Sequence, residues 1–351
     1  MKNQRHLILT LAVLVVTAAC GGGGGSTGSS DTAAPSTAAA PQIIAVDGSS
    51  TVYPVTEAVA EEFQKATPGT KVTVGRSGTG GGFQKFCRGE SAISNASRPI
   101  MAAEIDACQK AGITYIELPV AYDGMAIVVN PKNTWASAIT VADLKKLWEP
   151  AAQGTVLRWN QVRADWPNQE IHLFGAGVDS GTFDYFTEVI NGKAKVSRGD
   201  YTSSEDDNIL VQGVAGDQYA LGYMGLAYYE ENKDKLKLVP VDDGNPANGE
   251  GPIAPTPETV RNGTYRPLSR PIFIYASTAA LGRTEVQQFV QYYLEKASPL
   301  IKEVGYVPLT DAEQKLVIER FSSKKVGTMF DASAPADPKV SLEQRLSSQA
   351  K

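Results

Sequence analysis

The sequence contains few of the side chains on which metal centres and catalytic triads depend. Its 351 residues include three cysteines and two histidines. The first histidine, His6, lies close to the start of the chain. His172 is therefore the only histidine in the rest of the chain. Zinc clusters and Ser/His/Asp triads need histidine beside specific partners, so this count excludes most such sites.

Clusters of positive charge are also missing. The formal net charge is −5, and the lysines and arginines do not gather in runs. Binding along a nucleic acid requires clustered Lys and Arg to neutralise successive phosphates. Nucleic acid is therefore not an expected partner, and an anion would have to be held by local donors.

The N-terminus has the pattern of an export signal. Lys2 and Arg5 precede an apolar run over residues 7–16 that is too short for a stable membrane span. Small residues then precede Cys20, and a Gly/Ser/Thr/Ala/Pro-rich stretch runs to about residue 41. This is typical of a bacterial lipoprotein with a flexible tether, although Thr17 replaces the usual leucine. We expect residues 1–19 to be a signal peptide, residues 20–41 a tether, and the protein to be lipid-anchored through Cys20 on the periplasmic or extracellular face of a bacterial membrane.

Two further cysteines, Cys87 and Cys108, remain in the exported part. In an oxidising compartment they can form a disulfide, and two buried free thiols are the alternative.

Four segments repeat one local pattern: an apolar stretch, a loop rich in hydroxyl groups or glycine, and a helix start. The first backbone N–H groups of a helix lack intrahelical partners and lie at the positive end of its dipole, so a helix start favours anions. A single Ser or Thr at such a place can simply cap the helix. Repetition favours an anion site. The four loops are Gly48-Ser49-Ser50-Thr51-Val52-Tyr53-Pro54, Arg76-Ser77-Gly78-Thr79-Gly80-Gly81, Ala96-Ser97-Arg98-Pro99 and Asp179-Ser180-Gly181-Thr182.

In that order the loops resemble those of the substrate-binding protein of the high-affinity phosphate ABC importer, over roughly residues 42 to 325. The resemblance implies an α/β, two-lobed type II periplasmic-binding-protein fold, with a mainly parallel sheet flanked by helices in each lobe and two hinge crossings. We expect the crossings near residues 122–125 and 269–275. Lobe one would then comprise residues 42–123 and 270–330, lobe two residues 124–269, and residues 331–351 would form a tail that the core does not need.

The resemblance also implies which residues bind phosphate. The hydroxyl or backbone donors would come from Ser50, Thr51, Ser77, Ser180, Gly181 and Thr182. Arg98, at the entrance of the third helix, would add a guanidinium, whose paired donors suit a tetrahedral oxyanion.

Two positions depart from the family pattern. Arg98 stands where these proteins carry an aspartate that accepts the proton of hydrogen phosphate, and Ala176 stands where they carry an arginine. The proton acceptor is thus missing from its usual loop. Asp179 is one candidate for that role, and pairing with Arg98 is the alternative role for Asp179.

The function implied is capture of inorganic phosphate between the lobes by a monomer that delivers it to an ABC permease. No cofactor, metal or catalytic step is expected. The departures leave another oxyanion, such as sulfate or molybdate, as an alternative. An exported phosphatase or other hydrolase with Ser180 as nucleophile is an alternative from a different class, although Gly-x-x-Ser-Gly is not the Gly-x-Ser-x-Gly elbow. A sensor or adhesin that uses the same fold is a third.

Overall fold

The computed structural model describes residues 42–178, 180–204, 206–331 and 340–349. The predicted signal peptide, the tether, Cys20 and Asp179 lie outside these residues. Within the described parts, ten strands form one sheet, with the order β2-β1-β3-β11-β4-β8-β6-β7. Two short strands, β12 and β9, pair with β4 beside that path.

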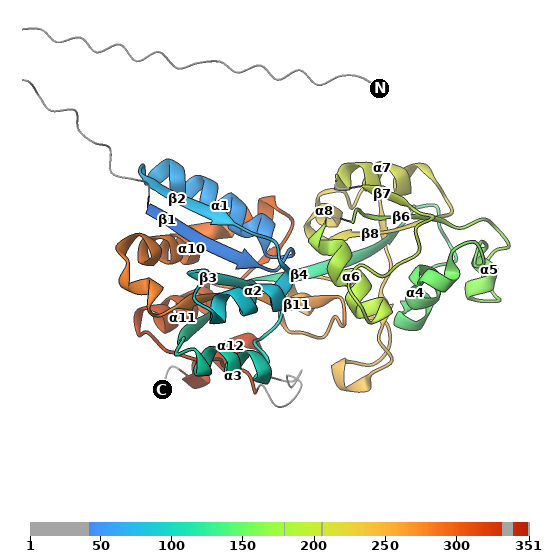
Figure 1. Cartoon of the computed structure of the whole chain (residues 1–351). Helices are drawn as coiled ribbons and strands as arrows, with labels where there is room; N and C mark the ends of the chain where they lie inside the picture. Colours follow the sequence, from blue (N-terminus) through green and yellow to red (C-terminus); the bar gives the residue numbers. More distant parts are fainter. Residues whose placement is uncertain (1–41, 179, 205, 332–339, 350–351) are drawn as a thin grey trace, which may run out of the picture. The chain divides into compact units, whose positions relative to one another are not determined.

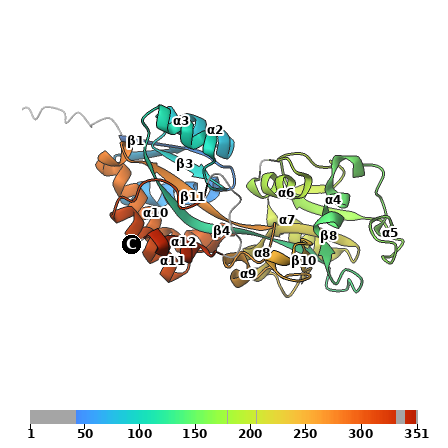
Figure 2. The same cartoon turned by 90° about the horizontal axis from the view of Figure 1, so that it is seen from below.

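Lobe one is built on three parallel strands, β1 (Gln42–Gly48), β2 (Thr70–Val74) and β3 (Ile93–Ala96). Two of its helices, α1 (Tyr53–Ala66) and α10 (Thr284–Glu303), pack together on one face of the sheet. Two others, α2 (Gly78–Cys87) and α3 (Ala102–Lys110), cover the opposite face (Figure 2). The remaining elements of this lobe are η3 (Ala280–Gly282), β12 (Val307–Pro308), α11 (Asp311–Ser322) and α12 (Leu342–Gln349).

Lobe two is built on β6 (His172–Ala176), which pairs in parallel with both β7 (Thr202–Ser204) and β8 (Ala220–Gly225). Thr140 is the N-cap of helix α4 (Val141–Trp148), and its hydroxyl accepts a hydrogen bond from the Asp143 N–H. The other helices are α5 (Trp159–Val162), α6 (Gly181–Asn191), α7 (Asp207–Gly216), α8 (Leu226–Glu231) and α9 (Pro257–Arg261), with η1 (Pro150–Ala152) and η2 (Pro246–Asn248). The short strands are β5 (Ile139–Thr140), β9 (Lys237–Leu238) and β10 (Val241–Asp242).

Two long antiparallel strands connect the lobes. Strand β4 (Tyr115–Val129) is buried along its whole length; it pairs with β11 (Ser269–Ser277) over residues 115–124 and with β8 over residues 125–129. The two strands are the hinge crossings that the fold class requires (Figure 1). The α/β class, the parallel core of each lobe and the two crossings are as expected.

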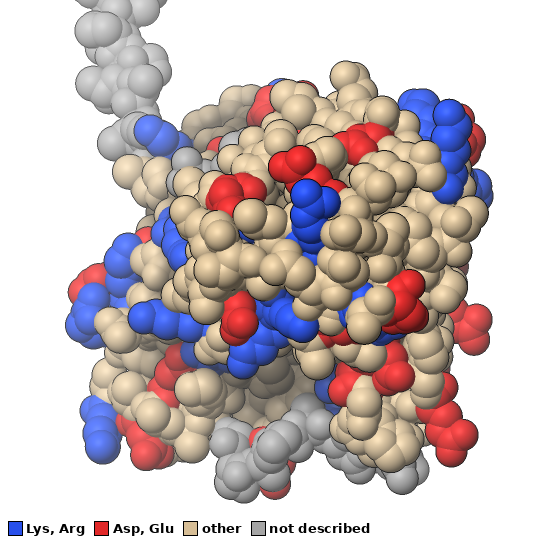
Figure 3. Space-filling view, turned by 90° about the vertical axis from the view of Figure 1, so that its right-hand side faces the viewer, with Lys and Arg blue, Asp and Glu red and all other residues tan. Residues whose placement is uncertain are grey.

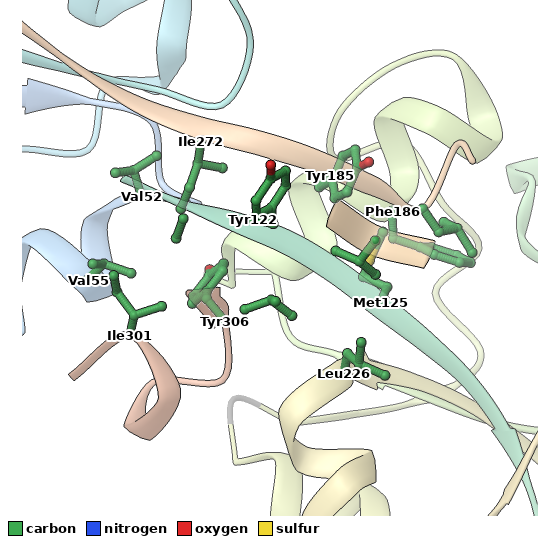
Figure 4. Close-up of a cluster of buried hydrophobic side chains, with 14 of the residues drawn as sticks. Val52, Val55, Tyr122, Met125, Tyr185, Phe186, Leu226, Ile272, Ile301 and Tyr306 are labelled. Carbon is green, nitrogen blue, oxygen red and sulfur yellow. The ribbon is translucent and has the colours of Figure 1, made fainter. Parts of the chain in front are cut away.

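The apolar core continues along these crossings. Ile272 and Tyr122 lie on the crossing strands between Val52 of lobe one and Phe186 of lobe two, and all four are buried in one cluster (Figure 4). Burial of apolar surface is the main source of fold stability. The hinge is therefore a packed region, and not an open linker.

Cys87 and Cys108 form a disulfide in the structure. The bridge links the end of α2 to α3, in a small second apolar cluster that also holds Phe83 and Phe86. The alternative of two free thiols does not describe this structure.

The end of the chain differs from expectation. Leu342 and Leu346 of α12 are buried in the main core, and α12 packs on α11. The idea that the tail lies outside the core is wrong for these two leucines, because Leu342 and Leu346 are one turn apart and present one apolar stripe to lobe one. None of the described helices is both long and apolar enough to span a membrane.

Candidate anion-binding site

The first and fourth loops meet between the lobes. Each precedes a helix, and the Thr51 hydroxyl donates a 3.3 Å hydrogen bond to the Gly181 carbonyl. The Tyr306 hydroxyl donates to the Thr51 carbonyl at 2.7 Å and so holds the first loop in place. The N-terminal ends of α1 and α6 are thereby brought close together, although 130 residues separate Thr51 from Gly181.

Ser50 makes a second contact between the same loops. Its hydroxyl donates to Asp184 Oδ2 at 2.7 Å, and Asp184 lies in the first turn of α6. Asp184 Oδ1 is buried and has no hydrogen-bond partner among the described residues. Lys195 Nζ lies 3.7 Å from that oxygen. Sequence reasoning missed Asp184, although a carboxylate four residues after Ser180 sits on the same helical face.

Ser180 is the N-cap of α6. Its hydroxyl accepts a 3.1 Å hydrogen bond from the Thr182 N–H. This is the capping role that a serine at a helix start often has. The positive end of the α6 dipole, with Gly181 and Thr182 in its first turn, lies beside Thr51.

Ser77 is the N-cap of α2, but its donors point to a neighbouring carboxylate. Both its N–H and its hydroxyl donate to Asp47 Oδ1. Lys85 also binds Asp47, through the other oxygen. Burial works against ionisation of Asp47, yet the hydrogen bonds from Lys85 and Ser77 hold its pKa below the ordinary value. Ser77 would have to leave Asp47 to donate to an anion.

Arg98 follows β3, and its guanidinium is held by a carboxylate of its own lobe. Nη1 and Nη2 donate to the two Glu104 oxygens at 2.9 and 2.8 Å, and Nη1 also reaches the Pro99 carbonyl. Glu104 in turn accepts from the Met101 N–H, which fixes it at the start of α3. The forked pair uses much of the donor capacity of Arg98.

A second guanidinium, which sequence reasoning missed, lies at the hinge. Arg270 on β11 donates a 3.1 Å hydrogen bond to the Thr51 hydroxyl, and its Cζ lies 3.4 Å from the centre of the Tyr185 ring. Arg270 is opposite Asp123 in the pairing of β11 with β4, with Nε 3.6 Å from Asp123 Oδ2. The sequence held one signal for this pair: an arginine and an aspartate each lie within a stretch that is otherwise mostly apolar.

Asp123 is almost completely buried. Burial raises its pKa to about 6, and the nearby Arg270 opposes the rise without cancelling it. The carboxyl therefore changes charge at a higher pH than an ordinary aspartate.

A cavity of about 580 Å³ opens between the lobes; Arg98 and Arg270 line it, whereas Ser50, Thr51 and Ser180 do not. Figure 3 shows a hollow on one face of the molecule with Lys and Arg side chains gathered next to it. Glu188 and Asp243 supply acidic groups to the lining. The arginines that line the cavity are Arg98, Arg261, Arg266, Arg270 and Arg345. Among the described residues no group of three or more His, Cys, Asp or Glu side chains could hold a metal ion.

Comparison with known proteins places the chain in a family. The PBP superfamily domain matches residues 33–297. The protein SphX of Synechocystis is 48% identical over 297 residues, which cover 84% of this chain and 87% of SphX. The phosphate-binding protein PstS of Staphylococcus saprophyticus is 37% identical over 77% of this chain and 83% of its own. This chain belongs to the PstS/SphX family. This chain is also similar to the crystal structure of a possible phosphate-binding protein from Planctomyces limnophilus. The match has a TM-score of 0.77 and 49% sequence identity, and it covers 81% of this chain and 99% of that protein.

Membership of the PstS/SphX family confirms that the chain is a binding protein and not an enzyme. The geometry agrees with this. His172 binds Asp217, and the Ser180 hydroxyl accepts from its own helix, so neither forms a nucleophile–base pair with the other.

Proposed function

We propose that this protein captures inorganic phosphate in the cleft between its lobes and delivers it to an ABC permease. The observation that supports this most directly is the contact between Thr51 and Gly181, because it brings two helix N-termini from different lobes to one place. Two converging helix dipoles favour a small, doubly charged anion.

Within this proposal the predicted residues keep their roles. Ser50, Thr51, Ser180, Gly181 and Thr182 would surround the anion with hydroxyl and backbone donors. The hydroxyls of Ser50, Thr51 and Ser77 would have to leave Asp184, the Gly181 carbonyl and Asp47, to which they donate now. Hydrogen bonds to charged groups contribute about 1.5–3 kcal/mol each. A few of these, beyond the entropy lost on binding, suffice for micromolar affinity, about −8 kcal/mol.

The proton acceptor for hydrogen phosphate would be a carboxylate near the first turn of α6. Asp179 keeps that role as a proposal, and Asp184 is added because its buried Oδ1 has no hydrogen-bond partner in the described chain. A buried carboxylate facing an anion that carries no proton is an unpaired like charge, so such a group selects against sulfate.

Transport also requires that the protein stay near the membrane. We propose that Cys20 is lipidated after removal of residues 1–19, and that a monomer on a tether of residues 20–41 docks on the permease. Replacement of Cys20 by alanine should release the protein into the soluble extracellular or periplasmic fraction, while phosphate affinity stays unchanged.

Isothermal titration calorimetry on the mature protein tests the central proposal. We expect tight binding of phosphate and arsenate, and at least tenfold weaker binding of sulfate and molybdate. Tight sulfate or molybdate binding with weak phosphate binding would instead support the other-oxyanion alternative, which the presence of Arg98 and Ala176 at the departing positions keeps open.

A further inference from the structure

Arg98 and Arg270 both line the cavity between the lobes, but their surroundings differ. We propose that Arg270, and not Arg98, supplies the guanidinium that contacts the bound anion, with Asp123 as its positioning partner. This inference rests on the proposed phosphate-binding function and names a residue of the same site.

The environment of Arg98 argues against direct contact with the ligand. Its two terminal nitrogens form a forked pair with Glu104, and both partners lie on the same lobe within six residues of each other. A bidentate Arg–carboxylate pair neutralises the charge and aligns the donors with the carboxylate. An anion that approached Arg98 would have to compete with Glu104.

Arg270 has a larger unused donor capacity. A guanidinium carries five N–H donors, and Arg270 makes only one hydrogen bond within the described residues, to Thr51. Within the part of the chain that the structure describes, the buried Arg270 Nε has no hydrogen-bond partner, and neither has the buried Asp123 Oδ2, 3.6 Å away. Nη1 lies 3.7 Å from Glu188 Oε2, which is too long for a hydrogen bond. Unused guanidinium donors are rare in the interior of folded proteins, and an anion beside Arg270 would supply acceptors for the N–H groups that face the cavity.

The position of Arg270 couples it to both lobes. It lies on the crossing strand β11, bonds to the first anion loop through Thr51, and covers the ring of Tyr185 on α6. The side chain is 15% exposed, so its charge is only partly screened by water. An anion held between the starts of α1 and α6 would thus lie next to a fixed cation at the hinge.

Asp123 helps to fix the position of the Arg270 guanidinium. It faces Arg270 across the β4–β11 pairing, and the stacking on Tyr185 restricts the guanidinium from another side. The 3.6 Å separation keeps Asp123 in ion-pair contact without using the Nε–H group.

The test compares arginine substitutions by calorimetric titration with inorganic phosphate. Arg270→Met is expected to weaken binding at least about 30-fold, since charge-assisted hydrogen bonds are lost and each is worth roughly 10- to 150-fold. Arg98→Met is also expected to raise the dissociation constant for phosphate, but by a factor at least ten times smaller than the factor for Arg270→Met. Arg88→Met is the matched control, because Arg88 also pairs with a carboxylate, Glu90, but is exposed away from the cavity.

Arg270→Lys keeps the positive charge beside Asp123 and guards against a folding artefact. The thermal unfolding midpoint of this variant should be near that of the wild type. Its affinity for phosphate should nevertheless be at least tenfold lower, because an ammonium lacks the planar fork of donors that a guanidinium has. The inference is overturned if Arg270→Lys binds like the wild type, or if Arg98→Met loses as much affinity as Arg270→Met. Absence of phosphate binding by the wild type would instead refute the proposed function itself.

Discussion

A Cβ atom placed on Gly181 would lie 2.5 Å from Thr51 Cα and 2.6 Å from Thr51 N. Real Cβ atoms do not approach other atoms so closely, and the atoms they would meet here are backbone atoms that cannot swing away. Glycine at position 181 therefore lets the first loop and the start of α6 meet across the lobes.

Gly181→Ala should weaken phosphate binding while the protein stays folded. Overpacking a tight contact costs about 1–3 kcal/mol, which corresponds to roughly 5- to 150-fold in affinity. Titration calorimetry measures this. Gly216→Ala is the control, since a Cβ there meets nothing within 4 Å, and equal affinities for the two variants would contradict the expectation.

Asp184→Asn should reduce the preference for phosphate over sulfate. If Asp184 accepts the proton of hydrogen phosphate, an amide in its place no longer repels an unprotonated anion, and the ratio of the two affinities should fall at least about tenfold. Competitive titrations with the two anions measure the ratio. Asp179→Asn is the parallel test, and Asp234→Asn, at an exposed position, is the control. An unchanged ratio in both site variants would remove the acceptor role from both residues.

Asp123→Asn should change how stability depends on pH. The pKa of this carboxyl rises from 3.8 to about 6 on folding, so between these values the folded state binds more protons than the unfolded state. The free energy of unfolding of the wild type should therefore fall as the pH rises from about 4 to about 6, by about 3 kcal/mol from this group. Asparagine does not titrate, and the variant should lack this fall.

Urea unfolding of both proteins at pH values near 4 and 7 isolates the contribution of Asp123, since other groups titrate alike in the two. Parallel stability curves for the wild type and Asp123→Asn would show that this carboxyl is not perturbed as described.

Reduction of the Cys87–Cys108 disulfide should lower stability without changing the site. Closing a loop of 21 residues' separation restricts the unfolded chain and stabilises the fold by about 3 kcal/mol. Urea unfolding with and without a reducing agent measures the loss. Phosphate affinity should remain within about twofold, because neither cysteine lines the cavity. A large loss of affinity would show that the bridge between α2 and α3 is needed to position the site.

Leu346→Ala should destabilise lobe one although the residue is near the end of the chain. Its side chain is 3% exposed, and truncating a buried leucine costs about 2–5 kcal/mol. Chemical denaturation measures this. Ser347→Ala, on the exposed side of α12, is the control. If Leu346→Ala destabilises the protein as little as the control does, the tail is not needed by the core, as the sequence led us to expect.

Local patterns in the sequence were sufficient for the four loops at helix starts, and the resemblance of these loops to a known family implied the α/β class. Alternating and apolar runs determine strands, and a glycine-rich or hydroxyl-rich segment after a strand determines where the next helix begins. Ser77 and Ser180, from two of these loops, are N-cap residues in the structure.

Tertiary structure decided which charges meet. Arg270 reaches Thr51 across 219 positions of sequence, and Ser50 reaches Asp184 across 134. Arg98, which the motif order placed in the site, lines the cavity and pairs with Glu104, six residues away. Ion pairs and hydrogen bonds depend on distances of a few ångströms, and the crossing strands β4 and β11 set those distances by bringing together segments that no local pattern relates.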